Sequence, residues 1–276
     1  MGTSFVLLAA GVGRRFGGLK QLAPVGPNGE AIIDLTIADA AEAGFDEVVA
    51  IVRHSIAGEI REHIERRSPI PLRLAFQDDL LPTRAKPWGT AHALLSAAPL
   101  LDGPFAVANA DDYYDVDGVE QLARWIATRR RPNAACLVAY RLGDTLSPRG
   151  SVSRGICDVD PAGTLVRCVE NLRIERGDDG VVRSEKGVLT DDAAASMNLF
   201  GFDLSVLDLI RAEWEKWIPG KVDDAEDECR LPEVLNDLVA AGRTQVDVVR
   251  TSGAWMGITY TDDLEPTRAA LAHRFA

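Results

Sequence analysis

The chain has 276 residues, of which 46% are hydrophobic, so it can bury a large core. It carries 42 Asp and Glu against 30 Lys and Arg, which gives a formal net charge of -12. A field of this sign repels nucleic acids and anionic membranes at long range, so we expect neither as a partner. An anionic small molecule can still bind where local positive charge outweighs the global field.

Cysteine usage and the lack of long apolar runs favour a cytoplasmic protein. The four cysteines show no paired spacing of the kind that metal sites need, and reduced thiols are typical of the cytoplasm. The opening apolar run, residues 5–10, is shorter than the core of a signal peptide. No segment approaches the length of a membrane span.

Strands and helices are predicted to alternate over the first part of the chain. The expected strands are 4–8, 47–52, 72–76 and 105–109, and the expected helices are 31–43, 56–67, one from 90 onwards, and 116–129. Gly44 follows the first helix in a position that commonly ends one. This alternation is typical of a mainly parallel sheet with helices on both faces.

After about residue 134 the pattern changes. Strands predicted at 156–159 and 165–170 are joined by the turn Asp160-Pro161-Ala162-Gly163, which predicts a hairpin. Further strands are expected at 195–202 and 245–249, further helices at 205–217, 231–241 and 262–275, and a mobile polar insertion at 177–192. The predicted fold class is therefore α/β, with a Rossmann-like mixed, mainly parallel sheet and helices on both faces.

A glycine-rich loop follows the first predicted strand, and residues 9–20 read AAGVGRRFGGLK. Loops at the carboxyl ends of parallel strands bind ligands, and glycines let backbone amides approach phosphate oxygens. The first acidic residue of the chain is Glu30, so Arg14, Arg15 and Lys20 have no neutralising neighbour in sequence. In a chain of net charge -12 this predicts a cationic phosphate pocket.

Other meanings of the loop fit less well. A dinucleotide-binding loop needs its third glycine one position before Gly17, and an acid after the second strand, where Val52-Arg53-His54 stands. A Walker-type loop is excluded because no Gly-Lys-Ser or Gly-Lys-Thr occurs. A merely structural glycine turn stays open as an alternative.

The segment Leu8-Ala9-Ala10-Gly11-x-Gly13-x-Arg15, followed by Lys20-Gln21-Leu22, resembles the signature of sugar-nucleotide pyrophosphorylases and related nucleotidyltransferases. The resemblance implies a glycosyltransferase-A-like fold, an NTP, a phosphorylated small-molecule acceptor, and Mg²⁺ as cofactor. It also implies that residues 8–11 and 13 bind the nucleotide. Arg15 and Lys20 would act on the triphosphate and the leaving pyrophosphate.

The segment Pro87-Trp88-Gly89-Thr90-Ala91-His92-Ala93 is similar to the one with which the uridylyltransferases of the family recognise the base. The resemblance implies nucleotide binding by Gly89 and Thr90, with Gln77 reading the base edge. Thr90 would open a helix and so place amides and a hydroxyl beside the ligand. His92 is interpreted as a packed helix residue.

Acidic residues follow the strand predicted at 105–109, which runs into Asn109-Ala110-Asp111-Asp112. Carboxylates at the carboxyl end of a strand are good oxygen ligands for Mg²⁺. The segment resembles the Gly-Asp-Asn and Gly-Asp-Val segments of the family, which implies that Asp111 binds the metal and Asn109 the nucleotide. Asp112 and Asp115 can instead cap the following helix.

The predicted hairpin resembles the sugar-side hairpin of the family through Ser153-Arg154-Gly155-Ile156 and Val169-Glu170-Asn171. The resemblance implies that Gly155 approaches the acceptor and that Glu170 accepts hydrogen bonds from sugar hydroxyls. Asn198 would add a third contact on this side. Glu and Asn at strand ends are also common surface residues, so that alternative stays open.

A last segment, Trp255-Met256-Gly257, resembles a Trp-x-Asp segment that supplies a second metal ligand in the family. Gly257 stands where the aspartate would be. Either Asp262 or Asp263 reaches the metal, or Asp111 works with phosphate oxygens and water alone. The alternative for Asp262 is a plain helix cap, which we favour over the metal ligand.

The predicted reaction joins an NTP to a sugar 1-phosphate and gives an NDP-sugar and pyrophosphate. A phosphate monoester is ionised near neutral pH, so it needs no general base. We expect one domain over residues 1–276, with a nucleotide-binding half at about 1–133 and an acceptor-binding half at about 134–276.

Three other functions stay open. They are a cytidylyltransferase of the molybdenum-cofactor type, indicated by the short Arg15–Lys20 segment, a metal-dependent glycosyltransferase that uses Asp111 and Asp112, and a non-catalytic nucleotide-sugar sensor. The base, the acceptor and the oligomeric state stay open too.

Overall fold

The structure is a computed structural model that describes residues 2–11, 18–80, 82, 84, 86–128, 131–221, 226–258 and 263–275. The strands are β1 Ser4–Leu8, β2 Glu47–Val52, β3 Leu72–Phe76, β4 Phe105–Asn109, β5 Asp112–Tyr113, β6 Ala134–Arg141, β7 Val152–Val159, β8 Leu165–Arg176, β9 Val182–Ser184, β10 Gly187–Leu189, β11 Ala194–Phe202, β12 Gln245–Arg250 and β13 Met256–Gly257. The helices are α1 Ile32–Glu42, α2 Ala57–Glu65, α3 Thr90–Ala97, α4 Asp115–Thr128, α5 Val206–Trp217, α6 Leu231–Ala240 and α7 Leu264–Leu271. Short 3₁₀ turns lie at Lys20–Leu22, Gln77–Asp79, Ala98–Leu100, Leu142–Thr145 and Ala272–Phe275.

The first part of the chain builds a parallel block of strands in the order β4-β1-β2-β3. β1 is paired on both sides, and its last residue, Leu8, stands in register with Ile51 of β2 and Asn109 of β4. The carboxyl ends of these three strands therefore lie at one edge of the sheet. Loops that leave there are brought together although they are far apart in sequence.

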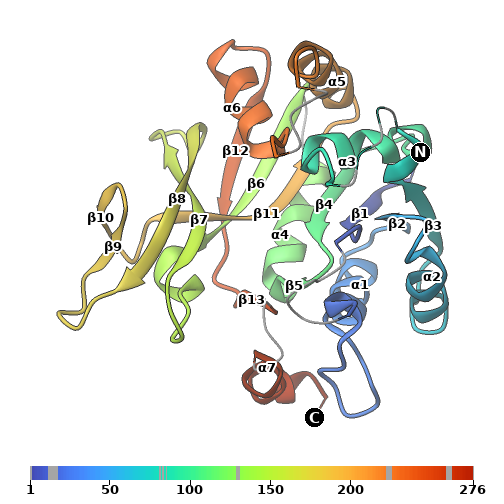
Figure 1. The fold of residues 1–276 in the computed structure, drawn as a ribbon, viewed down its shortest axis with the longest axis horizontal. Coiled ribbons are helices and arrows are strands. Elements are labelled where there is room, and N and C mark those ends of the chain that lie inside the picture. Colours follow the sequence, from blue (N-terminus) through green and yellow to red (C-terminus); the bar gives the residue numbers. More distant parts are fainter. Residues whose placement is uncertain are drawn as a thin grey trace.

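The second part of the chain extends the same sheet with mostly antiparallel strands (Figure 1). β11 joins the two parts because it is antiparallel to β4, β6 and β7, and its pairing with β6 shifts register between Ser196 and Phe200. The predicted hairpin around residues 160–163 is present as β7–β8. The segment 177–192, predicted as an insertion, contains the short hairpin β9–β10 that continues the sheet from β8.

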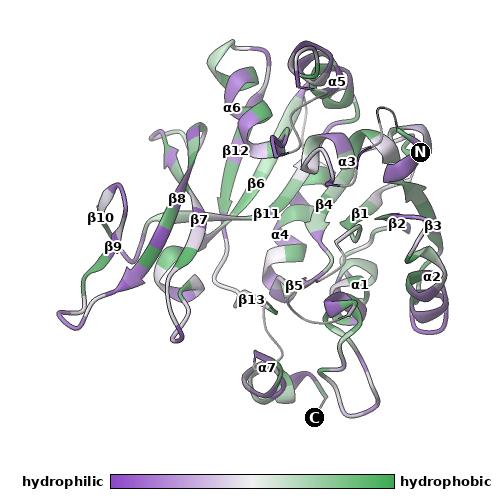
Figure 2. Cartoon of the chain, in the orientation of Figure 1, coloured by the Kyte–Doolittle hydropathy of each residue, from purple (hydrophilic) through white to green (hydrophobic). Residues whose placement is uncertain are grey.

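Alternating side chains of the strands pack against helices on two faces of the sheet. On one face Phe5 and Leu7 of β1 join apolar residues of α1, α2 and α4, and on the other Val6 joins α3, α5 and α6. Figure 2 shows the inner strands of the sheet, such as β4, β6 and β11, as mostly hydrophobic. The predicted α/β fold, a mixed sheet with helices on both faces, is confirmed. Among the described helices none has the length and apolar character that a membrane crossing requires.

The last turn of the described chain is fastened to α1 by a buried ion pair. The Arg274 guanidinium pairs with the carboxylate of Asp39, whose side chain is 1% exposed, and donates to the Tyr113 hydroxyl at 2.9 Å. Burial raises the pKa of Asp39 above its ordinary value, and the hydrogen bond from Arg274 opposes that rise. The pair therefore offsets part of the cost of burying the Asp39 carboxylate under the C-terminal segment.

Arg274→Ala is expected to lower the free energy of unfolding by about 3–5 kcal/mol, because it leaves the buried Asp39 carboxylate without its partner. Denaturant unfolding followed by circular dichroism measures the change. Arg61→Ala removes an exposed pair with Glu65 and is the matched control, with an expected cost under about 1 kcal/mol. Equal losses in the two variants would contradict the role given to the buried pair.

Candidate active site

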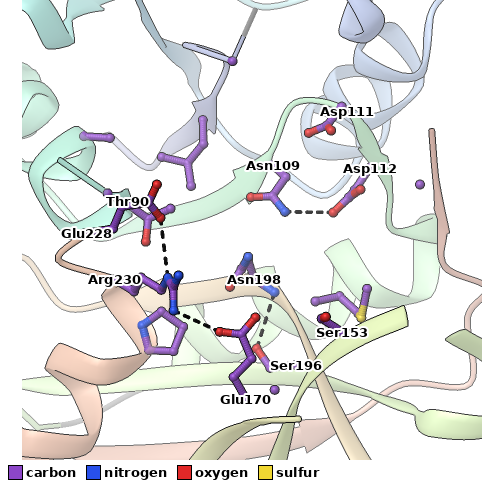
Figure 3. A pocket seen from close by; sticks show the side chains of 18 of the residues that line it. Thr90, Asn109, Asp111, Asp112, Ser153, Glu170, Ser196, Asn198, Glu228 and Arg230 are labelled. Atoms are coloured by element: carbon purple, nitrogen blue, oxygen red, sulfur yellow. Dashed lines mark hydrogen bonds and ion pairs between the residues drawn. The ribbon is translucent and has the colours of Figure 1, made fainter. Parts of the chain in front are cut away.

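A cavity of about 600 Å³ opens at the sheet edge where β1, β2 and β4 end (Figure 3). Its walls come from both parts of the chain. Most of the predicted site residues that the structure describes line it: Leu8, Ala10, Gly11, Lys20, Gln77, Gly89, Thr90, Asn109, Asp111, Gly155, Glu170 and Asn198. Ala9 lies behind this surface and is buried. Gly13, Arg15 and Asp262 lie outside the described residues.

Lys20 and Asp111 meet as an ion pair at the floor of this cavity. Lys20 begins a short 3₁₀ turn whose next residue, Gln21, is buried and donates to the carbonyls of Ala9 and Gly11, each at 3.2 Å. Those two bonds tie the end of the glycine loop to its beginning. The Lys20 ammonium is thereby held over the end of β4, where Asp111 follows the strand.

Asp112 is a buried carboxylate beside this ion pair. Its Oδ2 accepts a hydrogen bond from Asn109 Nδ2 at 2.8 Å and lies 3.3 Å from the Tyr114 hydroxyl. Burial, reinforced by the charge of Asp111, raises the pKa of Asp112 to about 7. The capping alternative is wrong for Asp112. The residue lies in β5, and its carboxylate is bound by the side chains of Asn109 and Tyr114 rather than by the backbone of a helix start.

The backbone at Gly89 makes a close approach to the segment before α6. Gly89 has φ 102°, and a Cβ there would collide with the backbone of Cys229. Cys229 N donates to Trp88 O at 2.7 Å, and Leu231 N donates to Thr90 Oγ1 at 2.8 Å. Position 89 therefore needs a glycine, and the start of α3 is fixed against the chain that leads into α6.

Gln77 is buried at the cavity wall and contacts His92, which confirms His92 as a packed helix residue. His92 Nε2 lies 3.1 Å from the Leu80 carbonyl, so this nitrogen carries the proton. Nδ1 then accepts from Gln77 Nε2, which lies 3.5 Å away. Burial lowers the pKa of His92 and keeps the ring neutral.

The hairpin and β11 form the opposite wall. Gly155 stands in register with Glu170 of β8 and with Ser196 of β11. Asn198 has φ 62° in the irregular part of β11, which turns it toward the cavity that it lines. The Glu170 carboxylate is not free, because its Oε2 lies 3.1 Å from Arg230 Nη1 (Figure 3).

Arg230 itself was not predicted from the sequence. It stands just before α6 and also approaches Glu228 at 3.5 Å and Glu233 at 3.4 Å. All three side chains line the cavity. The pairing of Arg230 with Glu170 shows no sequence signal, since the two residues lie 60 positions apart along the chain.

Arg154 and Trp255 are a second unpredicted pair, although both lie in segments that carry predicted residues. The Arg154 guanidinium lies 4.7 Å from the centroid of the Trp255 ring. Its Nη2 donates to Thr145 O at 2.6 Å and its Nη1 to Ser153 O at 2.9 Å. Burial lowers the pKa of Arg154, and the charge of Asp112 opposes that shift. Arg154 Nε and Trp255 Nε1 are buried without a hydrogen-bond partner among the described residues.

Gly257 leaves no room for the aspartate that the related segment carries. It pairs with Asp112 through β13 and β5, and a Cβ at position 257 would lie 2.8 Å from Asp112 Oδ1 and 2.7 Å from the Trp255 ring. The side of the cavity that an acid at 257 would reach is filled by Asp112. Asp263 pairs with Arg149 at 3.3 Å. Within the described ranges, no three His, Cys, Asp or Glu side chains gather as a metal site.

Comparison with known proteins agrees with this geometry. No curated protein sequence matches the chain. The profile of the family described as MobA-like NTP transferase domain matches residues 5–182, more than half of the chain, and this stretch contains Lys20, Asp111, Gly155 and Glu170. The chain therefore belongs to the family of the MobA-like NTP transferase domain, and it is a nucleotidyltransferase.

Proposed function

We propose that the chain transfers a nucleotidyl group from an NTP to a sugar 1-phosphate, which gives an NDP-sugar and pyrophosphate. One observation carries the proposal: one cavity of about 600 Å³ is lined by Lys20 and Asp111, from the segments that follow β1 and β4, and by Glu170 and Asn198 on the opposite wall. A cation and a carboxylate beside a glycine loop suit a triphosphate. Carboxylate and amide oxygens opposite them suit the hydroxyls of a sugar.

The residues at the end of β4 fit Mg²⁺. Mg²⁺ binds through one or two carboxylates together with substrate phosphates and water, and here the Asp111 carboxylate already holds a cation, the Lys20 ammonium. Asp111 would be the protein ligand, and Asp112 stands next to it with Oδ2 engaged by Asn109. Bound Mg²⁺ would neutralise charge on the triphosphate as pyrophosphate leaves.

The chain's own groups position the reactants rather than move protons. The acceptor phosphate is ionised near neutral pH, so the nucleophile needs no base. Lys20, once its ammonium leaves Asp111, can donate to the oxygens of the departing pyrophosphate. The Gly89–Thr90 backbone and Gln77 would hold the nucleoside at the far end of the same cavity.

A grid of nucleoside triphosphates against sugar 1-phosphates with Mg²⁺, with released pyrophosphate as the readout, tests the proposal. Pyrophosphate from at least one pair supports it. Release only with another phosphorylated acceptor and CTP would favour the cytidylyltransferase alternative instead. Release of a nucleoside diphosphate from an NDP-sugar would indicate a glycosyltransferase, and calorimetric binding without exchange of labelled pyrophosphate would indicate a sensor.

Asp111→Ala and Lys20→Ala are each expected to lower kcat by about 10²-fold or more, the effect of losing one preorganised electrostatic group. Pyrophosphate release under saturating substrates measures the change. Asp102→Ala and Lys216→Ala are the matched controls, because both side chains are exposed and lie outside the cavity lining. Turnover like that of the controls in either site variant would refute the assignment.

Lys20→Ala is also expected to raise the affinity of the free protein for Mn²⁺ by about 2- to 5-fold, because the ammonium no longer competes for the Asp111 carboxylate. Electron paramagnetic resonance of free Mn²⁺ measures binding without nucleotide. Asp111→Ala should weaken the same binding. If both variants weakened it alike, the two side chains would not be competing partners.

A further inference from the structure

Among the described residues, three cationic side chains line the cavity, and they differ in their partners. Lys20 is paired with Asp111, and Arg230 is paired with Glu170 and two further glutamates. Arg154 forms no ion pair with a carboxylate of the described residues. Among the described residues, it is therefore the cavity cation that is not already paired with a carboxylate.

The Arg154 guanidinium is nevertheless held in one orientation. Two backbone carbonyls, of Thr145 and Ser153, accept from its Nη atoms at 2.6 and 2.9 Å, and its Cζ lies over the Trp255 ring. A fixed planar fork loses little conformational freedom when it binds an anion. Lysine at this position could neither stack in the same way nor present two parallel donors.

Arg154 and Trp255 have N–H groups that no acceptor among the described residues uses. The guanidinium has more N–H groups than its two carbonyl partners use, and its Nε–H, together with the indole N–H of Trp255, is buried without an acceptor among the described residues. Buried N–H groups almost always have an acceptor. Two unpaired donors in touching side chains that both line the cavity therefore indicate an acceptor brought by a ligand. An anionic oxygen is the acceptor that suits a guanidinium best.

We propose that Arg154, stacked on Trp255, binds the phosphate group of the acceptor substrate. This inference rests on the proposed function and deepens it, because it assigns the nucleophilic phosphate to the β7 wall and leaves the triphosphate to the glycine loop. Arg154 lies next to Gly155 in β7, and the charge of Asp112 raises its pKa against the effect of burial. It thus lies on the acceptor hairpin, near the carboxylate that follows β4, and an attacking phosphate has to bind between these two parts of the cavity.

The local charge strengthens the need for such a group. Glu170, Glu228 and Glu233 line the cavity together with Asp111 and Asp112, and a phosphate entering it meets repulsion from these carboxylates. Arg230 is shared among the three glutamates. A cation without a carboxylate partner offsets the repulsion at one defined place.

The test compares the KM values of the two substrates in Arg154→Gln, Arg154→Lys and Trp255→Phe. Arg154→Gln is expected to raise the KM for the acceptor about 10- to 100-fold while the KM for the NTP changes less than about 2-fold. Arg154→Lys should fall between wild type and Arg154→Gln, because it keeps the charge and loses the fork. Arg124→Gln, an exposed arginine of α4 bonded to Gln121, is the matched control.

A second readout does not need turnover. Inorganic phosphate is titrated into the metal-free protein and followed by ³¹P line broadening, in samples whose near-ultraviolet circular dichroism shows them to be folded. Weaker phosphate binding in Arg154→Gln, with Arg124→Gln like wild type, is the expected result. An unchanged acceptor KM, equal rises in both KM values, or phosphate binding that is absent or insensitive to position 154 would overturn the inference. If wild type releases pyrophosphate with no acceptor, the proposed function fails, and the phosphate titration still decides on Arg154.

Discussion

The register of β1 between β2 and β4 is the constraint on which the site depends. Leu8 is in register with Ile51 and Asn109, so the glycine loop after β1 and the acidic residues after β4 leave the sheet at the same edge. Phe5 and Leu7 face one helical layer and Val6 the other, and both layers are buried. A slip of one residue would turn each side chain toward the wrong layer. Core packing thus fixes where Lys20 and Asp111 meet.

Local patterns were sufficient to predict the parts of the site that belong to continuous segments. A few neighbouring residues were enough to recognise each of three segments: the glycine loop, the helix start at Gly89–Thr90, and the acidic residues around Asp111 after β4. Strand and helix periodicity likewise predicted the alternating first half and the hairpin at residues 160–163. Because parallel strands place their carboxyl ends together, the shared edge could be predicted without any coordinates.

Features that depend on long-range pairing could not be predicted in this way. The sequence shows that position 257 lacks an acid, but only the β13–β5 pairing shows that the Asp112 carboxylate and the Trp255 ring fill the space. Asp112, whose pKa is raised by burial, likewise pairs through β5 with Gly257, which is distant along the chain. Arg154 stacks on a tryptophan about a hundred residues later, and no periodicity encodes such a contact.

β11 has a consequence for how the two walls of the cavity communicate. The strand hydrogen-bonds to β7 over its first residues and to β4 over its last ones, with the irregular stretch that holds Asn198 between them. β11 therefore connects the hairpin to β4, the strand that Asp111 follows, and the register shift is a point where β11 bends. The two walls of the cavity are therefore connected through a single strand, and Asn198, which lines the cavity, lies in the one stretch of that strand where its pairing with β6 is irregular.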